Sequence, residues 1–381
     1  MNKIGIIGSG TMGIGIAQVA ATAGCEVFLY DQNLAQTEKS LLNLKKVLDR
    51  LVEKQKVSAE KSADVFNKVK PCSELSDFKD CNLVIEAIIE NKEIKTKVFK
   101  TLEEIVSDDC IIASNTSSIS ITSLSSELKN PARFIGIHFF NPAPLMPLVE
   151  VIPGLLTDKN LAENIFNLMK SWGKTPVIAK DVPGFIVNRI ARPFYGEALR
   201  IVEENIATPE QVDDAMRSLG NFRMGPFELM DLIGIDVNFA VTKTVYADYY
   251  FDPKYKPSLL QQRMSEAKLL GRKTGKGFYD YSGETQESRV KSQDIKDDQL
   301  YAEIFLRIIS MLINEAVEAK RLGIANDEAI ELAMQKGVNY PKGLLAWGKE
   351  IGFDNISETL QNLYDAYQEE RYRQSPLLRK M

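Results

Sequence analysis

The sequence predicts an α/β protein: a doubly wound sheet of the Rossmann type, followed by an all-helical C-terminal domain present in two copies. Three observations lead to this fold class. In the first half, short apolar runs alternate with amphipathic stretches, which is the pattern of βαβ units. From about Pro183 onward the pattern is almost wholly helical. Within this helical half, residues recur at a constant offset of 118 positions.

Composition and charge set the broad class of the protein. The chain has 381 residues, of which 44% are hydrophobic and 26% charged, so collagen-like, coiled-coil, disordered and disulfide-scaffold proteins are excluded. This length is typical of two or three domains, each with its own core. The net charge of -5 argues against a dedicated nucleic-acid binder, which needs a basic surface. Histidine is nearly absent, since His138 is the only one.

The cysteines and the N-terminal stretch bear on cellular setting. The cysteines form no Cys-x-x-Cys pair and have no histidine nearby, so we expect no metal site, no disulfide framework and a reduced, cytoplasmic environment. Residues 4–24 are fairly apolar, but they carry five glycines and several polar residues. We therefore expect neither a signal peptide nor a membrane-spanning segment. The four cysteines are Cys25, Cys72, Cys81 and Cys110.

Apolar runs and helical patterns alternate along the first half of the chain. The runs expected to form strands are Lys3–Ile7, Glu26–Tyr30, Asn82–Glu86, Ile111–Ala113, Arg133–Phe139 and Leu148–Ile152. Helices are expected over Met12–Ala23, Asn33–Lys54 and Ile119–Leu128. Strands that alternate with helices build a parallel sheet, whose carboxyl edge is where ligands bind.

The repeat in the helical half needs no gap. An offset of 118 pairs Glu197 with Glu315, and it also aligns Ala215-Met216 with Ala333-Met334, Gly225 with Gly343, Gly234 with Gly352 and Asp236 with Asp354. We interpret it as a duplication. A polar stretch from Ser282 to Asp298 resembles a linker. The expected domains are a dinucleotide-binding unit over 1–183, a helical domain over 184–282, a linker over 283–298, and a second helical copy without a site over 299–381.

A glycine-rich turn follows the first strand and opens the first helix. In Gly8-Ser9-Gly10-Thr11-Met12-Gly13, the first glycine permits a tight turn, the second lets the backbone approach a pyrophosphate, and the third lets the helix pack on the strand. Asp31 ends the next strand, where a carboxylate accepts from the ribose 2′-OH of NAD and repels the 2′-phosphate of NADP. The sequence therefore predicts NAD; the alternative is an ordinary glycine turn before a strand-ending aspartate.

A basic stripe runs along the second predicted helix. Lys46, Arg50 and Lys54 recur every four residues, on a different stripe from the apolar Leu41, Leu44, Leu48 and Leu51. A solvated charged face explains such spacing, and a local anion site for a phosphate-bearing substrate explains it equally well.

The single histidine ends a predicted strand beside a proline-rich loop, and Glu150 lies on the next strand. A short loop between the strands can bring the two side chains together. A carboxylate that accepts from one imidazole nitrogen leaves the other to take a proton from a substrate hydroxyl. The pair His138 and Glu150 thus suits dehydrogenation of an alcohol, although a histidine after a strand is more often structural.

Two further polar sites complete the candidate set. Residues Ser114–Ser118 follow another predicted strand, where one serine can cap the next helix and another can hold a substrate oxygen. Asn188 lies near the start of a long helical region, where its amide can donate to a carbonyl oxygen.

Short motifs at these places and others, over residues 1 to about 282, resemble the 3-hydroxyacyl-CoA dehydrogenase family, and most closely its short bacterial members, the 3-hydroxybutyryl-CoA dehydrogenases. The motifs are Gly8–Ala17, Asp31-Gln32, Val84–Asn91, Ala113–Ser118, His138–Pro142, Pro183–Arg189, Met224–Leu229 and Gly271–Tyr279.

The resemblance implies reversible oxidation of an (S)-3-hydroxyacyl-CoA to the 3-oxoacyl-CoA with NAD, in fatty acid metabolism. It implies that His138 is the base, that Glu150 is its partner, and that Ser117 and Asn188 bind the reacting oxygen and the thioester region. It places CoA phosphates against Arg50 and Lys54. It places NAD against Gly8, Gly10, Thr11, Met12, Gly13, Asp31, Gln32, Glu90, Lys95, Asn115, Ser117, Asn141 and Lys273.

The second helical copy departs from the compact members, which use one helical domain as a dimer interface. The position 118 residues after Asn188 is Leu306, so we expect the second copy to lack a site and to pack against the first in place of a dimer partner. Two other functions stay open. A gulonate 3-dehydrogenase-like enzyme would oxidise a sugar acid, and a crystallin-like protein would keep the fold without catalysis.

Overall fold

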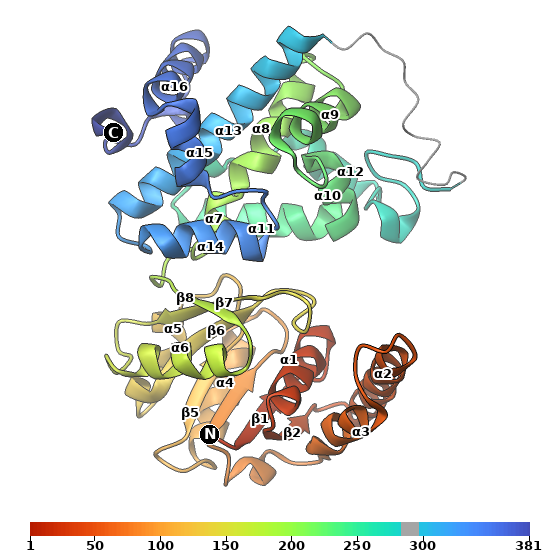
Figure 1. The fold of residues 1–381 in the computed structure, drawn as a ribbon. Coiled ribbons are helices and arrows are strands. Elements are labelled where there is room, and N and C mark those ends of the chain that lie inside the picture. The colour runs from red at the N-terminus through yellow and green to blue at the C-terminus, as the bar shows by residue number, and fades with distance from the viewer. Residues whose placement is uncertain (283–296) are drawn as a thin grey trace. The chain divides into compact units, whose positions relative to one another are not determined.

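The protein is described here from a computed structural model that covers residues 1–282 and 297–381 (Figure 1). Most of the predicted linker over 283–298 lies outside the described residues. The chain divides into two compact units, Met1–Phe185 and Ile186–Met381, which we call the N-terminal unit and the helical unit. Each is described by itself.

The described residues of the N-terminal unit build one sheet with the strand order β3-β2-β1-β4-β5-β6-β7-β8. Neighbouring strands are parallel except for β6 and β7, which are antiparallel. The order reverses direction between β1 and β4, as in a doubly wound sheet. The strands are β1 Lys3–Ile7, β2 Glu26–Tyr30, β3 Val69–Cys72, β4 Leu83–Glu86, β5 Ile111–Ser114, β6 Phe134–Phe139, β7 Leu148–Pro153 and β8 Thr175–Ile178.

The six predicted strands are confirmed to within one residue at each end, but β3 and β8 were not predicted. Both strands have four residues, and each contains a proline, Pro71 in β3 and Pro176 in β8. A proline argues against a strand because it has no N–H to donate to the hydrogen bonds between strands. They form the two edges of the sheet, where a missing donor is tolerated.

All four cysteines are buried, and burial raises the pKa of the Cys72, Cys81 and Cys110 thiols to about 12.

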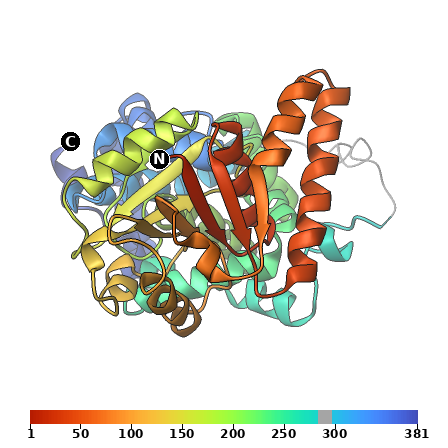
Figure 2. The same cartoon turned by 90° about the horizontal axis from the view of Figure 1, so that it is seen from below.

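The helices of the N-terminal unit bury their apolar stripes against this sheet and one another. Leu44 and Leu48 of the predicted stripe are buried in the same apolar cluster as strand residues such as Ile4 and Leu29. Helices α2 and α3 lie side by side at the β3 edge (Figure 2). The helices are α1 Thr11–Thr22, α2 Leu34–Glu53, α3 Ala59–Lys68, α4 Lys92–Glu103, α5 Ile121–Ser125 and α6 Leu161–Ser171.

Helix α5 is shorter than predicted. It begins after Ser120, whose side chain accepts a hydrogen bond from the Ser123 N–H at 3.1 Å. None of the serines in Ser114–Ser118 caps this helix, so that interpretation was wrong. The Asp181 carboxylate also accepts from the Ile121 and Thr122 N–H groups, which ties the start of α5 to the chain beyond β8.

The helical unit contains the predicted repeat as structure. Helices α10 and α11 correspond to α15 and α16 at the offset of 118, and the joints between the paired helices, Gly234 and Gly352, share positive φ values of 103° and 91°. The helices are α7 Val187–Ile190, α8 Arg192–Glu203, α9 Pro209–Gly220, α10 Pro226–Ile233, α11 Ile235–Asp248, α12 Leu259–Glu266, α13 Asp298–Arg321, α14 Asp327–Gly337, α15 Leu344–Ile351 and α16 Phe353–Tyr367.

Capping interactions recur at the same offset. Asp213 accepts hydrogen bonds from the Phe227 and Glu228 N–H groups, both at 2.9 Å. Its counterpart Glu331 accepts from the N–H groups of the two residues equivalent to these, Leu345 at 2.8 Å and Ala346 at 3.0 Å. The two copies are therefore alike in detail, as a duplication requires.

The copies pack against each other through ion pairs that each copy exchanges with the other. Arg189 of the first copy meets Glu315 of the second, and Arg307 of the second meets Glu197 of the first, each with Nε and Oε1 2.6 Å apart. Arg189 and Arg307 are themselves 118 residues apart, as are the two glutamates. Such reciprocal contacts are those of an interface with two-fold symmetry.

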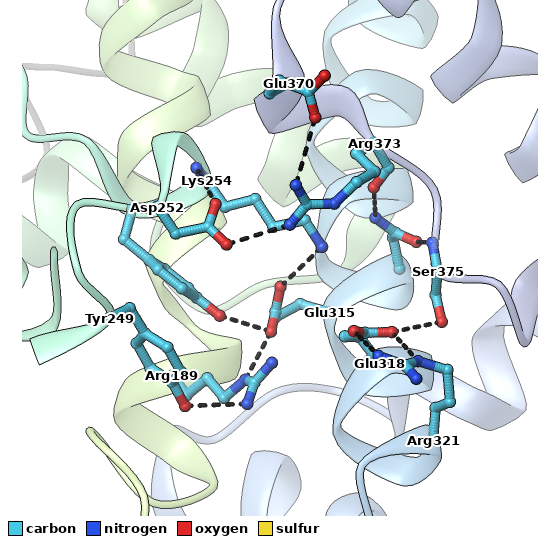
Figure 3. A network of polar contacts seen from close by, with 12 residues as sticks. Arg189, Tyr249, Asp252, Lys254, Glu315, Glu318, Arg321, Glu370, Arg373 and Ser375 are labelled. Atoms are coloured by element: carbon cyan, nitrogen blue, oxygen red, sulfur yellow. Dashed lines mark hydrogen bonds and ion pairs between the residues drawn. The ribbon is translucent and has the colours of Figure 1, made fainter.

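Tyrosines complete each exchanged pair in the same way. Arg189 donates to the Tyr249 hydroxyl at 2.9 Å, and the Tyr255 hydroxyl donates to Glu315 at 2.7 Å. Lys254 adds a second cation 3.6 Å from Glu315 (Figure 3). Burial alone would raise the pKa of Glu315, but Lys254, Arg189 and the Tyr255 hydrogen bond lower it below its ordinary value. The interior of the helical unit is thus charged but balanced.

Replacing Glu315 by glutamine leaves Arg189 and Lys254 buried without an anion. Loss of one member of a buried pair costs about 3–5 kcal/mol, so we expect Glu315→Gln to lower the free energy of unfolding by an amount in this range. Glu303→Gln, on an exposed face of α13, serves as the control. Denaturant unfolding followed by circular dichroism measures both, and equal midpoints for the two variants would contradict the role given to the pair.

Candidate active site

The glycine-rich turn lies at the carboxyl end of β1, where α1 begins at Thr11. Gly8 has a φ of +99°, and a Cβ there would lie 2.5 Å from the Ala87 carbonyl oxygen. A Cβ on Gly13 would lie 1.8 Å from the Gly8 oxygen. By contrast, a Cβ on Gly10 would meet nothing within 4 Å, so this residue faces open space. The two outer glycines are thus required by packing, and the middle one leaves room for a ligand.

The start of α1 is suited to an anion. Its N-cap Gly10 has no side chain to accept from the N–H groups of the first turn, which include those of Thr11 and Met12. Free N–H groups and the positive end of the helix dipole favour a phosphate. These residues therefore fit the pyrophosphate of a dinucleotide.

Asp31 lies just past β2 and is held against the glycine-rich turn. Its Oδ2 accepts from the backbone N–H of Ser9 at 2.8 Å and from the Ser9 hydroxyl at 3.0 Å. Its Oδ1 accepts from the Asn33 N–H at 3.0 Å, with Gln32 between them. A negative charge fixed beside the phosphate site favours a ribose with a free 2′-OH.

His138 and Glu150 face each other across the antiparallel pair β6 and β7. Nδ1 of His138 lies 2.7 Å from Oε2 of Glu150. His138 is 6% exposed and Glu150 is fully buried. The imidazole also lies beside the rings of Phe140 and Phe185, at 4.6 and 5.8 Å between centroids. A buried carboxylate on Nδ1 orients the ring and fixes its tautomer, which leaves Nε2 for chemistry.

Glu90 gathers the segment after β5. Its Oε1 accepts from the Thr116 hydroxyl at 2.6 Å, from the Ser117 N–H at 2.9 Å and from the Ser118 N–H at 3.2 Å. Its Oε2 lies 3.2 Å from Nζ of Lys95. Burial alone would raise the pKa of Glu90, but Lys95 and these hydrogen bonds lower it below its ordinary value. The predicted residues Glu90, Lys95 and Ser117 therefore form one network.

A second buried acid, Glu86, contacts Lys95 of this network. Glu86 at the end of β4 is fully buried, and its Oε1 lies 2.6 Å from Nζ of Lys95. Its other oxygen accepts from the Ser114 hydroxyl at 2.7 Å. Asn115, next along the chain, accepts from the Phe139 N–H at 2.8 Å and so joins β5 to the residue after His138. Asn141 follows two residues later, at a cis peptide bond with Pro142.

Family comparisons identify the chain. The model of the 3-hydroxyacyl-CoA dehydrogenase NAD binding domain matches residues 3–182, and that of the 3-hydroxyacyl-CoA dehydrogenase C-terminal domain matches residues 184–281 and 304–381. The chain belongs to the 3-hydroxyacyl-CoA dehydrogenase family. This assignment confirms the predicted fold, the NAD cofactor and the enzyme class.

Similar proteins support the assignment. A 3-hydroxyadipyl-CoA dehydrogenase of Escherichia coli is 36% identical over all of this chain and 97% of its own length. A 3-hydroxybutyryl-CoA dehydrogenase of Clostridioides difficile is 44% identical over 74% of this chain and 99% of its own length. The crystal structure of an Escherichia coli 3-hydroxybutyryl-CoA dehydrogenase superposes with a TM-score of 0.94 at 35% identity, covering 100% of this chain and 98% of that one.

The remaining predicted site residues of this dehydrogenase lie in the helical unit or on α2. Asn188 is in α7, and its carbonyl accepts from Nε of Arg192 at 2.8 Å. Lys273 pairs with Asp236 at 2.5 Å. On α2, Lys46, Arg50 and the adjoining Lys54 are exposed and have no ion-pair partner among the described residues.

Sequence reasoning missed Glu86 and Thr116, although both lie inside quoted motifs. Glu86 ends an apolar run, and a carboxylate at such a position signals a buried partner, which proves to be Lys95. Thr116 was passed over for the neighbouring serines, yet its hydroxyl makes the shortest bond to Glu90.

No described helix is long and apolar enough to cross a membrane.

Asp31→Asn removes the charge beside the glycine-rich turn but keeps the shape of the side chain. We expect the preference of kcat/KM for NADH over NADPH to fall by about tenfold or more, since that corresponds to only about 1.4 kcal/mol of lost repulsion and hydrogen bonding. Asp108→Asn, on an exposed loop, is the control. Steady-state kinetics with both cofactors measure the ratio, and an unchanged ratio would refute the role of Asp31.

Proposed function

We propose that His138 is the general base and acid with which this enzyme interconverts (S)-3-hydroxyacyl-CoA and 3-oxoacyl-CoA. The observation that carries the proposal is the buried bond between His138 Nδ1 and Glu150 Oε2, 2.7 Å long, at the carboxyl end of β6. In the oxidative direction, Nε2 takes the proton of the 3-hydroxyl group, and Glu150 stabilises the imidazolium that forms. Bound NAD supplies the acceptor for the hydride from C3.

Ser117 and Asn188 are proposed to hold the reacting oxygen and the thioester region. The Ser117 N–H and hydroxyl both lie near Glu90, which fixes the position of this serine without burying it. Gly8, Gly10, Thr11, Met12, Gly13, Asp31 and Gln32 are proposed to hold NAD at its phosphates and adenosine ribose, with Glu90, Lys95, Asn115, Asn141 and Lys273 near the nicotinamide end.

The basic stripe on α2 supports CoA as the carrier. Lys46, Arg50 and Lys54 present three cations on one face, with no ion-pair partner among residues 1–282 and 297–381, in a chain of net charge -5. Asp49 and Glu53 lie three residues beyond Lys46 and Arg50, a spacing that allows ion pairs, but Asp49 pairs with Lys45 at 3.2 Å instead. A sugar acid has no use for such a face, so it favours an acyl-CoA over a gulonate-like substrate. We propose Arg50 and Lys54 as ligands of the CoA phosphates.

The acyl group of the substrate and the location of the enzyme in the cell are also proposals. The names of similar proteins include both a 3-hydroxybutyryl and a 3-hydroxyadipyl thioester, and both are candidate substrates of this chain. We propose a short-chain substrate and a cytoplasmic location. The presence of Ser117, His138, Glu150 and Asn188 together argues against a non-catalytic, crystallin-like role.

The decisive variant is His138→Gln. With acetoacetyl-CoA, the wild-type enzyme should oxidise NADH, and the variant should lose about 10²–10⁴-fold in kcat, since general base catalysis is typically worth that factor. Its affinity for NADH, measured by fluorescence titration, should change little. Near-normal turnover in the variant would refute the role of His138. Turnover of a sugar acid with NAD, but none of the thioester, would refute the function.

We also infer that the second helical copy takes the place of a dimer partner. The exchanged pairs Arg189–Glu315 and Arg307–Glu197 are the contacts that two identical chains would make across a two-fold axis. Here both halves belong to one chain. The interface that compact relatives would use for dimerisation is therefore already filled.

The full-length chain should accordingly sediment as a monomer at micromolar concentration. Deleting residues 283–381 exposes the face of α8 and α9 that packs on α13, so the truncated chain should dimerise. Analytical ultracentrifugation of both proteins measures this. A full-length chain as strongly dimeric as the truncated one would contradict the inference.

A further inference from the structure

Arg192 is a buried cation whose partners are all neutral. It is the first residue of α8 and only 6% exposed. Its Nε donates to the Asn188 carbonyl at 2.8 Å, and its Nη1 donates to the Thr242 hydroxyl at 3.1 Å. Its guanidinium also lies 5.1 Å from the centre of the Tyr195 ring. No carboxylate in the described part of the chain lies within ion-pair distance of it.

The other buried arginines are paired with acids. Arg133 lies near Glu103, Arg189 contacts Glu315, and both Arg307 and Arg371 contact Glu197. A buried charge without a counter-charge costs several kcal/mol, so such a residue is kept only where something compensates. The protein supplies that compensation for each of the others and withholds it from Arg192.

The surroundings of Arg192 offer donors to an anion. The Tyr340 hydroxyl is buried and has no hydrogen-bond partner within the described part of the chain. Burial raises the pKa of Tyr340 well above its ordinary value, and Arg192 is close enough for its charge to act against that rise. Burial likewise lowers the pKa of Arg192 itself. A guanidinium and a free hydroxyl together suit a carboxylate, which accepts from both.

The internal repeat provides a control for this interpretation. Residues that serve the packing of the copies are retained at the offset of 118, as in Arg189 and Arg307. Asn188 and Arg192 are not retained, because the second copy has Leu306 and Ser310 there. The Ser310 hydroxyl is buried without a partner. Arg192 is thus lost together with Asn188, the residue proposed to bind the acyl group.

We propose that Arg192 binds a carboxylate at the far end of the acyl chain, so that the enzyme prefers CoA thioesters of dicarboxylic acids. The inference rests on the proposed function, in which Asn188 holds the thioester region. Arg192 begins α8 four residues after Asn188 of α7, and its Nε reaches the Asn188 carbonyl at 2.8 Å. A six-carbon dicarboxylic acyl group has its carboxyl carbon five positions beyond the thioester carbon, so a thioester held by Asn188 leaves that carboxylate free to extend to a neighbouring cation.

A pair of substrates tests the proposal. 3-Oxoadipyl-CoA and 3-oxohexanoyl-CoA have the same chain length and differ only in a carboxylate or a methyl end. With NADH, the wild-type kcat/KM for the dicarboxylic thioester should exceed that for the other by roughly 100-fold or more, because a buried polar site rejects an analogue that leaves it unpaired. Equal or better use of 3-oxohexanoyl-CoA would overturn the proposal.

Variants separate this role from a structural one. Arg192→Met should abolish or reverse the preference, since the carboxylate then enters an apolar site, whereas a merely structural role would lower both rates by the same factor. Arg192→Lys should restore part of the preference. Arg263→Met, at an exposed position of α12, should leave the preference unchanged. Turnover of neither thioester by the wild type would instead refute the proposed function, which the acetoacetyl-CoA assay checks separately.

Discussion

The bond between His138 and Glu150 depends on one antiparallel step in an otherwise parallel sheet. A parallel crossover from β6 would return the chain to the opposite end of the sheet before the next strand began. The short reversal over residues 140–147 instead starts β7 at the edge where β6 ends. The strand register then sets the glutamate opposite the histidine in the interior. Because that edge also carries the glycine-rich turn and Glu90, the proposed base and the proposed cofactor ligands share one side of the N-terminal unit.

Most buried charged groups of the described residues are paired with an opposite charge. The buried carboxylates Asp213 and Asp231 are held by backbone N–H groups and tyrosine hydroxyls instead. In the N-terminal unit, Lys95 neutralises Glu86 and Glu90 and thereby fixes the loop that carries Ser117. In the helical unit, arginines and glutamates exchanged between the copies neutralise one another. Each such group has its counter-charge within the fold, as the cost of desolvation demands. Among the buried arginines of the described residues, Arg192 has neutral partners in place of a counter-charge.

The sequence predicted the fold and the contact between His138 and Glu150 because both depend on local patterns. Strand runs, the glycine turn and the histidine at a strand end are legible from spacing alone, whereas the edge strands were hidden by Pro71 and Pro176. The repeat was visible from Glu197 and Glu315, but their exchange partners were not. Which arginine meets which glutamate depends on how the two copies pack, and an offset along the chain does not contain that information.

The duplication lets one chain use different residues for two purposes, packing between the copies and the candidate site. A symmetric dimer must serve both purposes with identical residues in each subunit. In a homodimer, a side chain that serves the site in one subunit is also present in the other, and the interface must accommodate both. Here the first copy has Asn188 and Arg192 where the second has Leu306 and Ser310, whereas Arg189 and Glu197 have the counterparts Arg307 and Glu315. An uncompensated cation such as Arg192 is consequently buried in one copy only. Comparing the copies position by position thus separates residues that pack the copies together, such as Arg189, from residues that one copy alone carries, such as Arg192.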